Sequence, residues 1–278
     1  MTIAFFSLLI FVVCLAAGCI GALSGLGGGV IIVPVLVLAF GCDIHYAAGA
    51  SLVSVVATSS GAAAAYLRDG YSNLRIAMFL EIATTSGAIF GSYLAGRLDS
   101  RTISIIFGLI LIYSAITAYY KKDSRHPAPV GDKLAEKLKL SGTYPEAGEM
   151  IAYAPRRVIS GFVVMLFAGT LSGLLGIGSG AMKVLALDQI MALPLKVSTT
   201  TSNLMIGVTA SASSGMYFKH GYIDPALAGP VVLGVVAGSM LGARLLPTIK
   251  TAVLRKGFAI VLLVVSLEMI GKGLGGRF

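Results

Sequence analysis

Lys183 places a positive charge inside an apolar part of the sequence, three residues after Gly180. An unpaired ammonium at membrane depth costs on the order of several kcal/mol, or is forced to give up its proton. A bound anion would compensate the charge, so Lys183 is a candidate anion ligand. Two alternatives are that the side chain reaches the membrane interface, or that it pairs with Asp188, which lies five positions further on.

Glycine clusters precede two short apolar stretches, at about 30–40 and 181–193. Glycine interrupts helix, and non-helical backbone at membrane depth persists only where it is buried in protein or lines a cavity. A helix that begins after such a break presents unpaired N–H groups with partial positive charge, which favour an anion. We therefore expect both clusters to bind substrate, with close helix packing as the alternative. The cluster residues in this prediction are Gly27, Gly28, Gly29, Gly178, Ser179 and Gly180.

Polar side chains follow each cluster on the next apolar segment. They include Ser51, Ser54 and Thr58 in the first half, and Ser202, Asn203 and Thr209 in the second. Polar groups inside a membrane must face protein or water, so they either contact a substrate or form hydrogen bonds between helices. The amide of Asn203 can donate to an oxyanion. We include Ser51, Thr58, Ser202 and Asn203 among the candidate substrate ligands.

Two carboxylates lie within apolar segments and are candidates for proton coupling, Glu81 and Asp188. Glu81 has two alternatives, an interfacial position or a pairing with Arg75. The histidines fall outside the apolar spans; His45 and His220 lie in short polar connections, where we expect solvated side chains. An intramembrane enzyme is disfavoured, because it would need a nucleophile and a base within a span.

The elements that must position these residues follow from composition. Apolar residues make up 56% of the 278 positions and charged residues only 12%, which excludes a soluble globule, a disordered chain and a disulfide scaffold. A bilayer core needs about 20 apolar residues per helix. The chain offers about eight such stretches and two short segments that follow the glycine clusters. We predict an all-α polytopic membrane protein with about eight transmembrane helices and two short glycine-broken segments.

The apolar pattern divides the chain into 1–120, a polar linker at 121–155, and 156–278. We expect a solvated linker with at most a short helix around 133–140. Its basic residues favour a cytoplasmic position under the positive-inside rule rather than a nucleic-acid site. The three cysteines lack metal-ligand spacing, so we predict no metal and no cofactor.

The second half repeats the first at an offset of 151 residues. This offset pairs Gly29 with Gly180, Ser51 with Ser202, and Thr58 with Thr209. The pattern indicates an internal duplication, and the distribution of basic residues slightly favours inverted over parallel halves. We interpret the pairs Gly87/Gly91 and Gly238/Gly242 as helix contacts, because small residues let backbones approach.

The duplicated glycine breaks, with 176–184 and 195–203 above all, resemble the sulfite exporter TauE/SafE family of bacterial membrane permeases. The resemblance covers nearly the whole chain except the central linker. It implies a duplicated multi-pass transporter of the bacterial cytoplasmic membrane, with members tied to export of sulfite and organosulfonates.

These observations predict a permease or exporter of small anions, with sulfite, a sulfonate or a related sulfur oxyanion as the substrate class. The expected partners are that small anion and the lipid bilayer, with no nucleic acid. In this hypothesis the two halves rock against each other around an anion held by the short-helix starts, Lys183 and Asn203. The alternative is a structural or assembly subunit of the membrane without a solute path.

Overall fold

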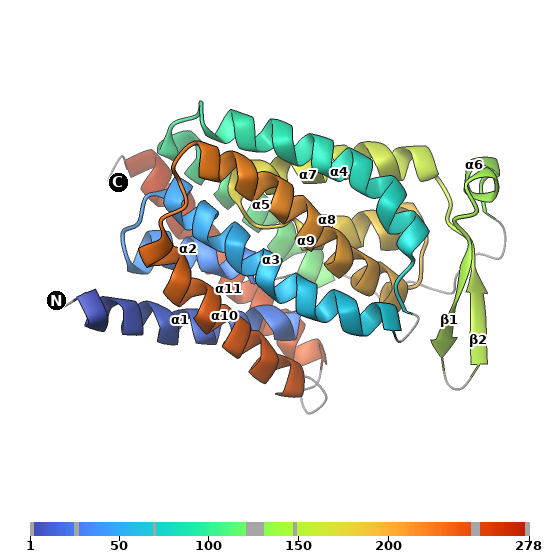
Figure 1. Cartoon of the computed structure of the whole chain (residues 1–278), viewed down its shortest axis with the longest axis horizontal. Helices are drawn as coiled ribbons and strands as arrows, with labels where there is room; N and C mark the ends of the chain where they lie inside the picture. The colour runs from blue at the N-terminus through green and yellow to red at the C-terminus, as the bar shows by residue number, and fades with distance from the viewer. Residues whose placement is uncertain are drawn as a thin grey trace.

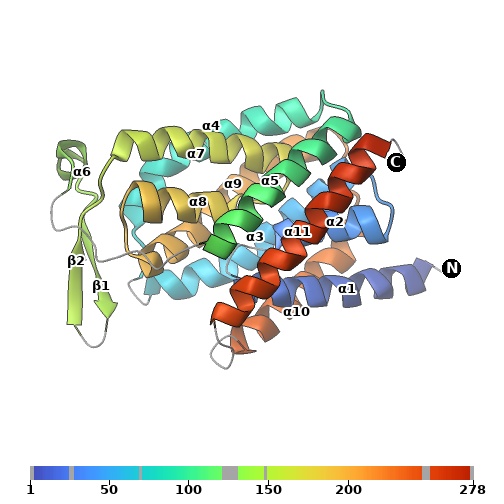
Figure 2. The same cartoon turned by 180° about the vertical axis from the view of Figure 1, so that it is seen from behind.

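The computed structural model describes residues 3–24, 28–68, 71–120, 131–146, 149–245 and 251–275. Eight helices of 18 to 25 residues dominate these described ranges, some along the long axis of the bundle and others oblique to it (Figures 1 and 2). Helix is expected, because in a bilayer every backbone polar group must be satisfied within the protein. The long helices are α1 (Ile3–Ser24), α3 (Ile44–Arg68), α4 (Leu74–Ala95), α5 (Ser100–Tyr120), α7 (Val158–Leu175), α9 (Leu195–Lys219), α10 (Pro225–Leu245) and α11 (Thr251–Gly275).

Two short helical segments complete the expected architecture. The first is α2 (Gly29–Ala39), and the second is α8 (Gly180–Leu185), continued by one π-helical turn, η1 (Ala186–Ile190). Each spans 11 residues in total, which as α-helix would be about 17 Å, too short to cross a bilayer. The prediction of an all-α fold with eight long and two short segments is confirmed.

The linker differs from the expected solvated segment, because its described part is folded. It contains α6 (Lys133–Lys137) and a hairpin of β1 (Gly142–Glu146) and β2 (Glu149–Tyr153), paired antiparallel. Tyr144 and Tyr153 are each 4% exposed and pack in one hydrophobic cluster with Ile76 and Met191 of the helical bundle. The burial of these rings against the bundle stabilises the hairpin. The polar composition of the linker does not reveal these contacts.

The polar connection before α3 also differs from expectation, because His45 is buried. Its Nδ1 lies 2.8 Å from Asp43 Oδ1, and its Nε2 lies 3.0 Å from the carbonyl oxygen of Ala95 at the end of α4. Ser100 Oγ donates to Asp43 Oδ2 at 2.5 Å. The hydrogen bonds from His45, and then that from Ser100, lower the pKa of Asp43 to about 2. The ring is buried because it forms hydrogen bonds with carbonyl oxygens at and just beyond the end of α4, which lack partners within the helix. His220 is exposed, as expected.

Four long-helix pairs build the bundle: α1 with α10, α4 with α7, α5 with α11, and α3 with α9. Glycines allow the closest approaches, as the interpretation of Gly87, Gly91 and Gly238 required. A Cβ built on Gly87 would lie 2.2 Å from the carbonyl oxygen of Leu166, and one on Gly238 would lie 2.0 Å from that of Leu15. The offset of 151 residues relates Gly87 to Gly238 and Leu15 to Leu166. The α4–α7 and α1–α10 interfaces therefore contain the same contact between corresponding residues.

Helices α3 and α9, which the 151-residue offset pairs, cross in opposite directions. Thr200 near the start of α9 bonds the carbonyl of Tyr71 beyond the end of α3, whereas the backbone of Tyr222, just after α9, approaches Gly49 near the start of α3. This is the relation that inverted halves require. The N- and C-termini lie at one end of the bundle and the linker hairpin at the other (Figures 1 and 2).

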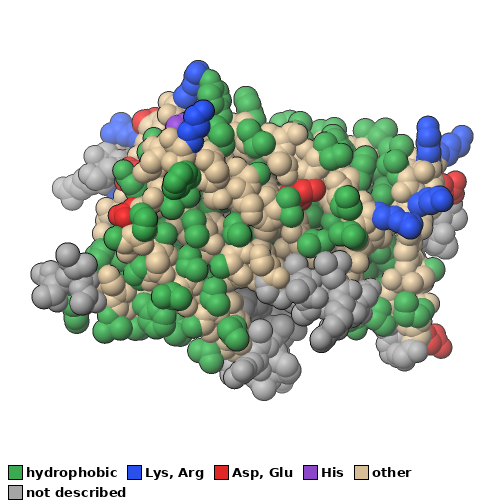
Figure 3. All heavy atoms as spheres, viewed as in Figure 1, with side chains coloured by type: hydrophobic (Ala, Val, Ile, Leu, Met, Phe, Trp, Pro, Cys, Tyr) green, Lys and Arg blue, Asp and Glu red, His purple; other side chains and the backbone are tan. Residues whose placement is uncertain are grey.

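The outer faces of the long helices are apolar. On the face that Figure 3 shows, hydrophobic side chains cover the length of the bundle, and Lys and Arg side chains gather at its two ends. Met78, Ile82 and Phe167 are each more than 60% exposed although they lie within α4 and α7. On the described residues alone, α4 and α7 have the length and mean hydropathy of membrane spans. This distribution suits a bundle that crosses the bilayer with its long axis along the membrane normal.

Candidate functional site

The two breaks predicted from the glycine clusters lie against each other inside the bundle. Gly29 begins α2, and a Cβ built on it would lie 3.0 Å from both the Cα and the carbonyl oxygen of Ile177, in the break before α8. The same Cβ would lie 2.9 Å from Ser51 Oγ on α3. Gly28, Gly29 and residues 176–180 are all buried. The contact between the breaks therefore needs a residue without a side chain at position 29.

The second break leaves helical geometry over several residues. Gly176 and Gly178 have φ of 68° and 71°, and Ser179 has φ of 46°, so all three occupy the left-handed region. A serine in this region costs about 1 kcal/mol or more, and such strain tends to occur at functional sites. The helix resumes at Gly180, whose N–H is among those without an intrahelical acceptor.

The first break is less distorted where the structure describes it. Gly28 has φ of −62° and ψ of −27°, within the right-handed helical region, whereas its counterpart at the 151-residue offset, Ser179, is left-handed. Gly27 lies outside the described residues. The two clusters thus differ in backbone conformation, although the sequence treats them alike.

The predicted hydroxyl ligands divide into two groups. Ser51 Oγ and Ser179 Oγ are buried at the meeting point of the breaks and have no hydrogen-bond partner in the described part of the chain. Ser202 Oγ donates to the carbonyl oxygen of Gly180 at 3.3 Å, which ties α9 to the start of α8. Thr58 Oγ1 instead donates to carbonyls of its own helix, at 3.0 Å to Ser54. Asn203 follows Ser202 on α9 and is half-buried.

Lys183 is completely buried, so its side chain does not reach the membrane interface. Its Nζ donates to the carbonyl oxygen of Met205 at 3.2 Å and to Thr209 Oγ1 at 2.5 Å, both on α9. An ammonium has three N–H donors. The described hydrogen bonds occupy two of them, so the group retains capacity for one more acceptor.

Thr209 connects Lys183 to Glu81. Its hydroxyl accepts from the ammonium and lies 2.6 Å from Glu81 Oε1, which also accepts from Thr85 Oγ1 at 3.0 Å. A proposed alternative partner of Glu81, Arg75, donates to the carbonyl of Lys139 in the linker. The structure therefore brings together Lys183 and Glu81, residues that the sequence separates by 102 positions. Asp188, the second candidate for proton coupling, is buried in η1.

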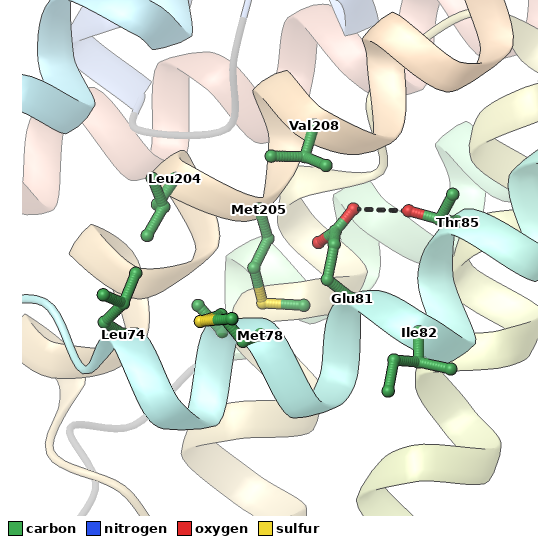
Figure 4. Close-up of a pocket in the computed structure, with 9 residues that line it drawn as sticks. Leu74, Met78, Glu81, Ile82, Thr85, Leu204, Met205 and Val208 are labelled. Atoms are coloured by element: carbon green, nitrogen blue, oxygen red, sulfur yellow. Dashed lines mark hydrogen bonds between the residues drawn. The ribbon is translucent and has the colours of Figure 1, made fainter.

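Glu81 lines a groove of about 410 Å³ between α4 and α9, which opens to the outer face beside the exposed side chains of Met78 and Ile82 (Figure 4). The wall is almost entirely apolar, with Glu81 and Thr85 as its polar side chains. The lining residues are Leu74, Ala77, Met78, Glu81, Ile82, Thr85, Leu204, Met205 and Val208. Glu81 Oε2 is buried and has no hydrogen-bond partner among the described residues, whereas Oε1 is bonded to the two threonines.

Comparison with known proteins adds a family to this geometry. The family model described as sulfite exporter TauE/SafE matches residues 10–269. The chain belongs to the sulfite exporter TauE/SafE family. Among its relatives, "Probable membrane transporter protein YunE" of Bacillus subtilis is 27% identical over 94% of this chain and 96% of its own length. "Probable membrane transporter protein YdhB" of the same species is 27% identical over 85% of this chain and 89% of its own length.

A relative from Xylella fastidiosa, also described as a probable membrane transporter protein, is 26% identical over 90% of this chain. No solved structure matches the chain. Membership in the TauE/SafE family makes this protein an integral membrane transporter of the bacterial inner membrane and not an enzyme. The alternative of a subunit without a solute path is therefore wrong.

The ligands predicted from the sequence of this TauE/SafE protein omit Thr209, which connects the two buried charges. The sequence contained one signal for it, because Thr209 corresponds to Thr58 at the 151-residue offset. Thr85 and the carbonyl of Met205 carried no signal, since a helix-bonded carbonyl or a lone threonine is indistinguishable from many others before the helices are packed.

Proposed function

We propose that this protein carries a small anion across the cytoplasmic membrane, and that the anion binds where the two helix breaks meet. Sulfite, a sulfonate or a related sulfur oxyanion is the substrate class to test first, since the family is described by sulfite export. The observation that carries the proposal is the full burial of Lys183 on the helix that begins at the second break. A buried ammonium needs negative charge nearby, and a substrate anion can supply it.

The surroundings of the breaks suit an oxyanion. The starts of α2 and α8 present N–H groups without intrahelical acceptors, and the residues there are glycines that leave the backbone uncovered. Ser51 Oγ and Ser179 Oγ are buried beside them with hydrogen-bonding capacity to spare. We assign the anion to these groups, with Gly28, Gly178 and Gly180 as backbone contacts. Ser202 supports the start of α8, and Asn203 is retained as a candidate ligand next to it.

Alternating access follows from the inverted halves. The breaks come from different halves and are in contact, so a movement of the helix pairs around them would change which side of the membrane reaches them. The proposed site is near the contact of α3 with α9, the helices that cross between the halves. The glycine contacts join α1 to α10 and α4 to α7, so each of these closely packed pairs takes one helix from each half and is expected to move as a unit.

The test is flux of radiolabelled sulfite, thiosulfate, sulfate and ethanesulfonate in proteoliposomes. We expect at least one anion to move, and Lys183→Met to reduce its flux by about tenfold or more, because a charged hydrogen bond to the substrate is lost. Lys219→Met is the matched control, since Lys219 is exposed at the end of α9 and outside the site. Equal flux in the Lys183→Met and parent proteins for every transported anion would remove Lys183 from the mechanism.

A further inference from the structure

Lys183, the cation of the proposed site, has an opposite charge near it in Glu81. Lys183 and Glu81 are bridged by the single hydroxyl of Thr209, so the buried ammonium is balanced by a carboxylate when no anion is bound. We propose that Glu81 is the proton-coupling group, and that it takes up one proton when a singly charged anion binds at Lys183. This inference rests on the proposed function.

The two carboxylate oxygens of Glu81 have different surroundings. Oε1 is held by Thr209 at 2.6 Å and by Thr85 at 3.0 Å. Oε2 is buried without a hydrogen-bond partner in the described residues. A proton can therefore bind at Oε2 while Oε1 keeps its contacts with Thr209 and Thr85, the second of which Figure 4 shows.

The net charge of the site is the same before and after the complete step. Before binding, the positive charge of Lys183 and the negative charge of Glu81 cancel. A proton from water forms an O–H bond at Oε2 and leaves Glu81 neutral, and the ammonium then has no internal counter-charge. The anion replaces that charge, so the loaded site is again neutral. A buried site favours states without net charge, since an uncompensated charge at membrane depth is costly.

Only one half of the molecule has this pair. At the 151-residue offset, Lys183 corresponds to Ile32 and Glu81 corresponds to Val232, although both halves have the threonine, as Thr58 and Thr209. Ile32 is fully buried, like Lys183. The asymmetry gives the protein one coupling group rather than two, and therefore one proton for a singly charged anion.

Other ionisable groups near Glu81 have separate surroundings. Helix α7, which packs along α4, has no ionisable side chain. On α9, Tyr217 donates to the carbonyl of Leu174, and Lys196 and Lys219 are exposed near the helix ends. On α4 itself, Arg75 bonds the linker, and Tyr93 lies under the guanidinium of Arg97. Asp188 in η1 is the buried carboxylate that the experiment must distinguish from Glu81.

The experiment measures proton uptake on anion binding to the full-length protein in nanodiscs. Titration calorimetry with thiosulfate or ethanesulfonate, anions that do not themselves titrate near neutral pH, is performed in buffers of different ionisation enthalpy. The parent protein should take up about one proton with ethanesulfonate at high pH. Its affinity should fall by about tenfold per pH unit in that range, because binding and protonation are linked.

The variant Glu81→Gln imitates the protonated carboxyl. We expect it to bind the anion without proton uptake, with an affinity that no longer changes with pH and that matches the parent value at low pH. Asp188→Asn is the matched control and should take up the proton as the parent does. Proton uptake in Glu81→Gln, or its loss in Asp188→Asn alone, would overturn the assignment.

The parent protein tests the inference even if Glu81→Gln does not fold. Anion binding without proton uptake at any pH would disprove the coupling and leave the proposed transport of anions intact. Binding of none of the anions would overturn the proposed function, and the coupling with it. The two failures are therefore distinguishable.

Discussion

The buried charges define the chemistry at the scale of single residues. Lys183 is fully buried, and the hydroxyl of Thr209 lies between it and Glu81. Removing one member of a buried charge pair leaves the other uncompensated, whereas removing both can be nearly neutral. We therefore expect the loss of either charge to destabilise the protein as long as the other charge remains.

A double-mutant cycle tests that dependence. We expect Lys183→Met to lower the free energy of unfolding by about 3 kcal/mol, and Lys183→Met/Glu81→Gln to be more stable than Lys183→Met. The coupling free energy should be about 1–3 kcal/mol. Thermal unfolding in the same detergent measures it, with Lys219→Met as the exposed control. Additive single and double variants would show that Thr209 does not transmit the charge of one residue to the other.

At the scale of elements, the decisive feature is the contact between the start of α2 and the break before α8. The contact depends on the missing side chain of Gly29, because any Cβ there would meet the backbone of Ile177. Backbone cannot move aside as a flexible side chain can, so the two breaks would have to separate.

The variant Gly29→Ala should therefore lower stability by about 1–3 kcal/mol and reduce anion flux. Gly215→Ala is the control within a helix: no atom lies within 4 Å of a Cβ built on Gly215, which is exposed on α9. Alanine has the higher helix propensity, so the control should be neutral or stabilising by up to about 1 kcal/mol. The comparison is made by thermal unfolding and by flux in proteoliposomes. Equal behaviour of the two variants would contradict a close contact at Gly29.

For the whole molecule, the distribution of basic residues predicts the orientation in the membrane. The termini lie at one end of the bundle and the linker hairpin at the other (Figure 2). Basic residues are concentrated in and around the linker, which favours its cytoplasmic position. The connection between α9 and α10 then faces the outside.

Cysteine labelling checks this orientation in a cysteine-free background. Met150→Cys places a thiol on the exposed hairpin, and Lys219→Cys places one at the opposite end. A membrane-impermeant maleimide should label Lys219→Cys in intact cells, and Met150→Cys only after permeabilisation. The reverse pattern would show that the linker faces outward.

The sequence alone determined the number and approximate length of the helical segments and the places where helices break. Apolar stretches of sufficient length must be helical in a bilayer, and glycine clusters interrupt them, so eight long and two short segments could be predicted without coordinates. The offset of 151 residues likewise predicted which glycines and hydroxyls correspond. The folded linker and the buried His45 were not predicted, because their burial depends on tertiary contacts.

Only the tertiary structure decided which residues meet. Lys183 and Glu81 are far apart in the sequence, and Asp188 is nearer to Lys183, yet Thr209 joins Lys183 to Glu81 because α9 packs between α8 and α4. Helix periodicity fixes the neighbours of a residue within its own helix. Contacts between helices depend on how surfaces pack, and here glycines that admit a neighbouring backbone set those distances.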